Sequence, residues 1–120
     1  MKPIQPVDRR VANIKTAKFQ SFVTEGADVP GQSYLQLDET FPPGAGFHIY
    51  RMAPGSTSQQ HEHTCHEQFL VLEGELMDND GTVYRAGDFV LLAEGTEHSS
   101  SSVTGCTLAV FIQTPERNLA

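Results

Sequence analysis

Long apolar runs are missing from this sequence, and cysteine is scarce. No stretch approaches the ~20 consecutive apolar residues that span a bilayer, and the N-terminus lacks the apolar core of a signal peptide. Two cysteines, Cys65 and Cys106, are too few for a disulfide framework, so we expect both to be free thiols, with Cys106 in an apolar strand. These features predict a cytoplasmic protein with no membrane partner.

Positive charge is also in short supply. The formal net charge is −7, and we expect lysine and arginine to be dispersed without forming a basic cluster. An acidic surface repels phosphate backbones and anionic lipids. We therefore predict that the protein has no nucleic-acid partner.

A helical pattern of apolar residues is not found either. Seven prolines and ten glycines are scattered along 120 residues, as in a single domain of short strands separated by turns. We expect a tight hairpin at Asp80-Gly81 and a turn at Glu73-Gly74. The pattern predicts an all-β sandwich or barrel. The expected strands are 47–52, 68–72, 75–78, 82–85, 89–92, 98–103 and 107–113.

The chain divides into three parts by composition. Residues 1–40 mix charge, proline and glycine with short apolar islands, and we expect an N-terminal arm and edge strands there. Residues 41–114 hold the regular strand pattern and are the predicted barrel. Residues 115–120 are predicted to form a C-terminal tail.

Candidate metal ligands gather just before the middle of this barrel. His61 and His63 are two residues apart, so on a strand they share a face. Glu67 has the same parity and can join them if the chain returns to that side, whereas His66 should point away. His98 lies much later and could complete the set from a neighbouring strand. The alternative is that these are unconnected histidines in a polar loop.

Three imidazoles and one carboxylate suit Fe(II), Mn(II), Ni(II), Cu(II) or Zn(II). With four protein ligands, an octahedral ion has two adjacent positions open to water, O₂ or a bidentate substrate. A tetrahedral zinc ion would be saturated by the same ligands. The sequence therefore predicts one divalent ion without choosing among these metals.

Other candidates could line a pocket beside the metal. Tyr50 and His48 share one face of the 47–52 strand and Arg51 lies on the other, and the sequence does not decide which face is inside. An inward Arg51 would suit a carboxylate or enolate substrate, and an inward Tyr50 could donate a proton. Cys65 is a candidate redox group, the alternative being a loop cysteine without a role. The remaining pocket candidates are Gln59, Phe69, Ser100 and Ser102.

The spacing of the ligands resembles the first conserved motif of the cupin superfamily, G(X)5HXH(X)3–4E(X)6G. The matching residues are Gly55, His61, His63, Glu67 and Gly74, and every specified position agrees. A second segment resembles G(X)5PXG(X)2H(X)3N. Its residues are Gly87, Ala93 in place of proline, Gly95, His98, and Ser102 in place of asparagine.

This resemblance implies an RmlC-like cupin fold, a double-stranded β-helix (jelly-roll) barrel over roughly residues 47–112. It also implies that His61, His63, Glu67 and His98 are the four ligands of one metal ion. In similar small cupins the N-terminal segment adds a strand to a neighbouring subunit, so we expect a homodimer.

Within the cupins, the first motif, the acidic Asp80-Gly81 hairpin and the late Gly105-Cys106 pair resemble the cupin domain of ChrR-type anti-sigma factors. The helical sigma-binding domain of that family is not found in this sequence, so we do not transfer anti-sigma activity. Our leading hypothesis is a small-molecule enzyme of dioxygenase or metal-dependent Lewis-acid type. The alternatives are a metal- or oxidant-sensing binding module and a purely structural metal site.

Overall fold

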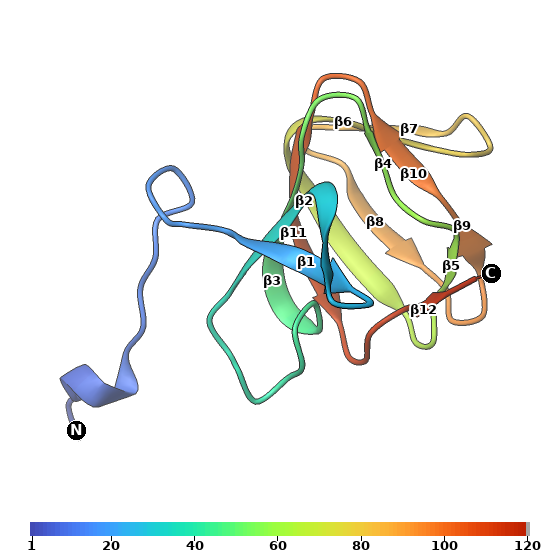
Figure 1. Ribbon diagram of the computed structural model, residues 1–120. Coiled ribbons are helices and arrows are strands. Elements are labelled where there is room, and N and C mark those ends of the chain that lie inside the picture. The colour runs from blue at the N-terminus through green and yellow to red at the C-terminus, as the bar shows by residue number, and fades with distance from the viewer. Residues whose placement is uncertain (120) are drawn as a thin grey trace.

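The computed structural model describes residues 1–119, and its regular structure is almost entirely β-strand (Figure 1). One turn of 3₁₀-helix, η1 (Pro6–Asp8), lies in the N-terminal arm. The all-β class predicted from the short strands and turns is confirmed. The strands are β1 (Gln20–Thr24), β2 (Ala27–Gln36), β3 (Gly46–Met52), β4 (Ser56–Thr57), β5 (His61–Glu62), β6 (Glu67–Asp78), β7 (Val83–Arg85), β8 (Phe89–Leu92), β9 (Glu97–His98), β10 (Ser100–Ser102), β11 (Cys106–Ile112) and β12 (Arg117–Asn118).

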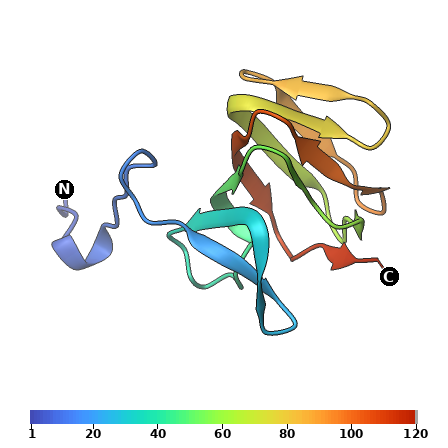
Figure 2. The same ribbon diagram turned by 45° about the horizontal axis from the view of Figure 1, so that its top comes forward.

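The strands form two sheets that curl into a barrel (Figures 1 and 2). The larger sheet has the order β1-β2-β3-β11-β6-β10-β4, and β7 and β8 also pair with β6. The smaller sheet has the order β12-β5-β9 and lies at one end of the barrel. The pairing between β5 and β9 brings the first histidine motif next to the distant His98.

Strand β6 bends where the sequence predicted a turn. Its first half pairs with β11 and β8, and its second half pairs with β7 and β10, so the Glu73-Gly74 turn was wrong. Gly74 has a φ of +76°, and a Cβ atom there would lie 2.0 Å from the carbonyl oxygen of Gly105. Only glycine allows the two backbones to approach this closely. The glycine therefore redirects a continuous strand around the barrel. The expected Asp80-Gly81 hairpin is present between β6 and β7.

The core fills the barrel with side chains from alternate positions of its strands. Phe69 and Val71 of β6 face Val110 and Leu108 of β11, and each is less than 6% exposed. Cys106 is 4% exposed and belongs to this core. Burying such side chains is the main contribution to the stability of the barrel.

The N-terminal arm extends away from the barrel before the chain enters β1 (Figures 1 and 2). Two arginine side chains attach its C-terminal half to the barrel: Arg10 donates to the carbonyl of Leu37 at 2.8 Å, and Arg51 donates to that of Ile14 at 3.0 Å. Strands β1 and β2 then form a hairpin on the edge of the larger sheet. No helix in the described part of the chain combines the length and apolar character needed to cross a bilayer.

Candidate metal centre

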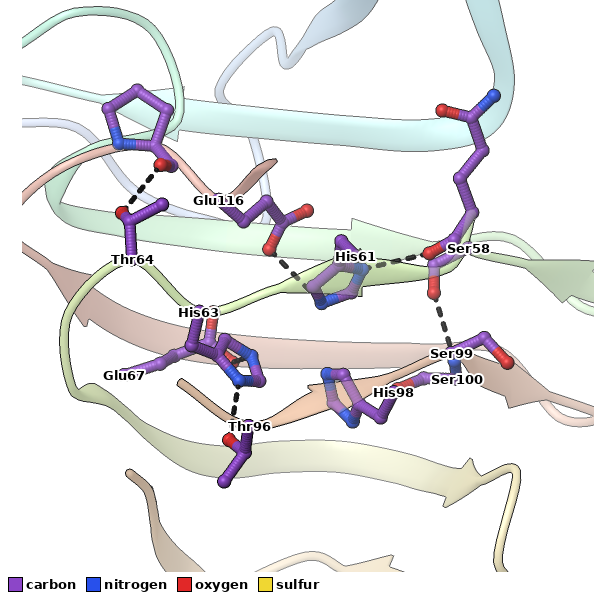
Figure 3. A network of polar contacts seen from close by, with 12 residues as sticks. Ser58, His61, His63, Thr64, Glu67, Thr96, His98, Ser99, Ser100 and Glu116 are labelled. Carbon is purple, nitrogen blue, oxygen red and sulfur yellow. Dashed lines mark hydrogen bonds and ion pairs between the residues drawn. The ribbon is translucent and has the colours of Figure 1, made fainter. Parts of the chain in front are cut away.

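Three histidines meet at one end of the barrel. His61 on β5 is directly opposite His98 on β9, and His63 follows β5 by one residue. The distances between ring centroids are 4.6 Å for His61 and His98, 4.7 Å for His63 and His98, and 5.2 Å for His61 and His63. One ring nitrogen from each lies within 4.8 Å of the others. Figure 3 shows the three rings around a common space.

The hydrogen bonds at Nδ1 determine which ring nitrogens face this space. His61 Nδ1 donates to the carbonyl oxygen of Gln59 at 2.8 Å, and His98 Nδ1 donates to the carboxylate of Asp78 at 3.0 Å. Thr96 Oγ1 lies 3.0 Å from His63 Nδ1. Because that hydroxyl donates its own hydrogen to the carbonyl of Ala93, it accepts from Nδ1. In the neutral histidines, all three Nε2 atoms therefore carry a free lone pair.

Glu67 approaches the group through His63. Its Oε1 is 3.6 Å from His63 Nε2, which is longer than a hydrogen bond. His63 is 1% exposed, and its Nε2 has no hydrogen-bond partner among the described residues. Burial alone would lower the pKa of His63, but the adjacent Glu67 carboxylate outweighs burial and the pKa is raised. A buried, unpartnered nitrogen beside a carboxylate fits a site for a cation.

Asp78 supports the centre from behind. One of its oxygens accepts hydrogen bonds from His98 and from Ser100 Oγ, at 3.0 and 2.9 Å, and the other accepts from the Tyr84 hydroxyl at 2.5 Å. Burial would raise the pKa of Asp78, but the hydrogen bonds from His98 and Tyr84 outweigh it and the pKa is lowered. A carboxylate behind an imidazole fixes its tautomer and increases the basicity of its free nitrogen.

Glu116 enters the same space from the C-terminal tail, where the sequence predicted no site. Its Oε2 is 3.2 Å from His61 Nε2, and it also groups with His63 and Glu67 (Figure 3). Its side chain is 40% exposed at the mouth of the barrel. Partial burial of the carboxylate, together with the charge of Glu67, raises the pKa of Glu116 to about 7.

A cavity of about 270 Å³ opens beside the histidines and extends towards the β1–β2 hairpin. His61, His98 and Glu67 line one end, and the wall includes apolar side chains such as Phe69. No lysine or arginine of the described residues lines it. Its volume lies just below the ~300–1,000 Å³ typical of small-molecule sites, and so suits a compact ligand.

Comparison with known proteins identifies the family. The family model described as ChrR Cupin-like domain matches residues 9–115. This chain belongs to the ChrR cupin-like family. The resemblance inferred from the two motifs is thus confirmed. A comparison with curated protein sequences gives no match to this ChrR-like cupin.

Solved structures resembling this ChrR-like cupin include enzymes and a regulator. An acetylacetone dioxygenase from Acinetobacter johnsonii is 14% identical with a TM-score of 0.74, over 93% of this chain and 78% of that one. The polyketide cyclase RemF from Streptomyces resistomycificus is 19% identical with a TM-score of 0.68, over 93% of this chain and 86% of that one. The complex of SigE with the anti-sigma ChrR from Rhodobacter sphaeroides contains a chain that is 19% identical with a TM-score of 0.63, over 82% of this chain and 49% of that one. At such identities the likeness establishes the fold alone.

The predicted pocket residues of this ChrR-like cupin divide into two groups. Arg51 lies outside the cavity, with its guanidinium 3.9 Å above the ring of Phe19, because odd-numbered side chains of β3 face outwards. Ser102 also does not line the cavity, since its hydroxyl donates to the carbonyl of Glu75. The candidates that do line it are Tyr50, Gln59, Phe69 and Ser100.

The inward face of β3 gives the cavity of this ChrR-like cupin two ring-bearing side chains. Tyr50 donates its hydroxyl hydrogen to Gln32 Oε1 at 2.7 Å, and burial raises its pKa, so it stays protonated and is a poor proton donor. His48 is 5% exposed, and burial lowers its pKa. Its Nδ1 lies 3.0 Å from the carbonyl of Gly46, to which it donates. Both residues are therefore uncharged, and they can accept hydrogen bonds from a ligand through the Tyr50 oxygen and the His48 Nε2.

Cys65 lies beside the candidate ligands in sequence but does not line the cavity. Its Sγ accepts hydrogen bonds from the backbone nitrogen and the hydroxyl of Thr114, both at 3.4 Å. Burial would raise the thiol pKa, but the hydrogen bonds from Thr114 outweigh it and the pKa of Cys65 is lowered. His66, predicted to point away, is exposed and accepts a hydrogen bond from the backbone of Glu94.

Proposed function

We propose that this cupin binds one divalent metal ion through His61, His63, Glu67 and His98. The observation that carries this proposal is the convergence of three Nε2 lone pairs on one space, each imposed by a hydrogen bond at Nδ1. Without a cation, three acceptor atoms and a carboxylate would be gathered in a largely buried site with little to satisfy them. Neutral imidazoles with second-shell partners are the usual form of metal-ligating histidine.

The function supported best is catalysis on a small molecule that offers two oxygen atoms to the metal. When bound, Fe(II) or a similar ion would polarise those oxygens as a Lewis acid or support reaction with O₂. The apolar wall around Phe69 favours a compact substrate. With no lysine or arginine of the described residues lining the cavity, a neutral β-diketone suits it better than a carboxylate.

Substrate-dependent oxygen uptake tests this proposal. We expect protein reconstituted with Fe(II) under anaerobic conditions to consume O₂ with small β-diketones and more slowly with hydroxy acids or thiols, because the cavity wall supplies no cation for a carboxylate. An oxygen electrode measures the rates for the whole panel. Ferrous protein that binds metal stoichiometrically but consumes no O₂ with any of these compounds would exclude the dioxygenase form of the proposal.

The second candidate function is a metal- or oxidant-sensing module. Two observations favour it: the family match, and the contact of Cys65 with Thr114 in the segment that leads to Glu116. Oxidation of this thiol would remove the hydrogen bonds that connect the metal-ligand loop to the C-terminal segment. Tightly held zinc with no oxygen uptake would move the assignment to this function.

We also infer a homodimer. The outer face of the larger sheet exposes an apolar surface that crosses four adjacent strands, since directly paired residues point to the same side. The apolar surface consists of Phe47, Leu70, Phe89, Leu91 and Phe111.

The lysines and arginines are less evenly dispersed than we expected from the sequence. Five of the eight lie in residues 1–18, so the N-terminal arm is basic and the barrel is strongly acidic. The basic arm of one copy is therefore attracted to the acidic barrel of a second copy.

Placing a charge on this apolar surface should separate the dimer. Phe47 is 64% exposed, so Phe47→Asp should leave the fold intact while burying an unpaired carboxylate at the interface. Light scattering coupled to size-exclusion chromatography should give twice the chain mass for the wild type and a single chain mass for the variant. Val103→Asp, at a site that is 80% exposed and away from this surface, is the control. A monomeric wild type would refute the inference.

A further inference from the structure

Glu116 lies where a further metal ligand would be. Its Oε2 is 3.2 Å from His61 Nε2, and its carboxylate is also within 4.8 Å of the nearest ligand atoms of His63 and Glu67 (Figure 3). Around an octahedral ion with bonds of about 2.1 Å, adjacent donor atoms are about 3 Å apart. The separation between Glu116 and His61 therefore equals that of two neighbouring ligands of one ion.

The hydrogen bonding of His61 makes this pair unfavourable without a cation. Because His61 Nδ1 donates to Gln59, the Nε2 facing Glu116 presents a lone pair. When Glu116 is ionised, its carboxylate oxygen is also an acceptor, so two acceptors then face each other across 3.2 Å. A cation that accepts electron pairs from both satisfies them together.

The backbone on both sides of Glu116 is attached to the metal-ligand loop. Before it, Thr114 Oγ1 lies 2.7 Å from Thr64 Oγ1, within hydrogen-bond distance. After it, Arg117 and Asn118 pair as β12 with β5, and Arg117 contacts the Glu62 carboxylate at 2.6 Å. The 40% exposed side chain can thus swing while its backbone stays in place.

We propose that Glu116 is a displaceable fifth protein ligand of the metal ion, an inference that rests on the proposed metal site. In the resting protein its carboxylate occupies one of the two positions that the other four ligands leave open. A substrate that binds through two oxygens replaces Glu116, and the side chain turns towards solvent. The C-terminal tail thereby restricts the centre to bidentate ligands.

Titration with Co(II) tests this inference by affinity and by spectrum. We expect Glu116→Gln to bind Co(II) about 10- to 100-fold more weakly than the wild type by calorimetry. The visible absorption spectrum of its cobalt form should differ from that of the wild type, because the d–d bands of Co(II) depend on the number and type of its ligands. The amide is isosteric and the side chain partly exposed, so the circular dichroism of the metal-free variant should match the wild type.

Glu97→Gln is the matched control, since it removes the same charge from an exposed residue adjacent to His98. Its Co(II) affinity and spectrum should equal those of the wild type, because exposed charges are screened. An affinity loss in Glu116→Gln with an unchanged cobalt spectrum would show a purely electrostatic effect and overturn the inference, as would no change in either. Absence of Co(II) binding by the wild type would instead refute the proposed function.

Discussion

The His61→Ala variant is expected to lose stoichiometric metal binding, with an affinity more than ~100-fold below that of the wild type. Changes in residues that only support a ligand cost about 10- to 100-fold, and loss of a ligand should exceed this. His61 is 5% exposed and occupies the centre of the group, between His98 and Glu116. Alanine removes one of the three imidazole nitrogens that lie within 4.8 Å of one another.

Stability measurements report the same loss without depending on activity. An ion at about 100 times its dissociation constant stabilises a folded protein by about 2.7 kcal/mol. We expect chelator to lower the urea midpoint of the wild type by a corresponding amount and to leave His61→Ala unchanged. His66→Ala is the matched control, because His66 is in the same loop but exposed and bonded to the backbone of Glu94. Equal metal binding by His61→Ala and the wild type would refute the ligand assignment.

Local spacing accounts for the meeting of His61, His63 and His98. The alternation of side chains along a strand places His61 and His63 together, and a glycine-containing turn allows His98 to return beside them. The same rule predicts the outward direction of His66. These placements depend only on short segments and on backbone geometry, which the sequence specifies directly.

The supporting residues could not be predicted because their contacts join distant segments. Asp78 reaches His98 only after β6 bends at Gly74 and pairs with β10, and Thr96 meets His63 only through a loop contact. Glu116 depends on the pairing of β12 with β5. A single acidic residue in a short polar tail carries no signal of such a pairing.

The sequence did not determine which face of β3 points into the barrel. Alternation separates Tyr50 from Arg51 but does not say which side is the interior. The N-terminal arm determines the direction of Arg51, because the guanidinium donates a hydrogen bond to the carbonyl of Ile14 and stacks over Phe19 on the outside of the barrel. The carboxylate or enolate substrate expected with an inward arginine therefore loses the side chain on which that expectation depended.

The Asp78→Ala variant should weaken metal binding about 100-fold and destabilise the protein by about 3 kcal/mol. This carboxylate holds His98 in the tautomer that presents Nε2, and it also accepts hydrogen bonds from Ser100 and Tyr84. Its removal leaves all three donors without their acceptor in a buried part of the barrel. Calorimetric metal titration and urea unfolding of the metal-free protein measure the two effects separately.

Two further variants separate charge from hydrogen bonding at this position. Asp78→Asn keeps an oxygen that can accept from His98, so its metal affinity should fall only about 10-fold, through loss of the charge that makes the imidazole more basic. Tyr84→Phe removes one hydroxyl from Asp78, and it should cost about 1 kcal/mol of stability while leaving metal affinity unchanged. Equal affinities in Asp78→Ala and the wild type would mean that His98 needs no support from Asp78. The Asp78 carboxylate would then contribute to the stability of the barrel but not to the affinity for metal.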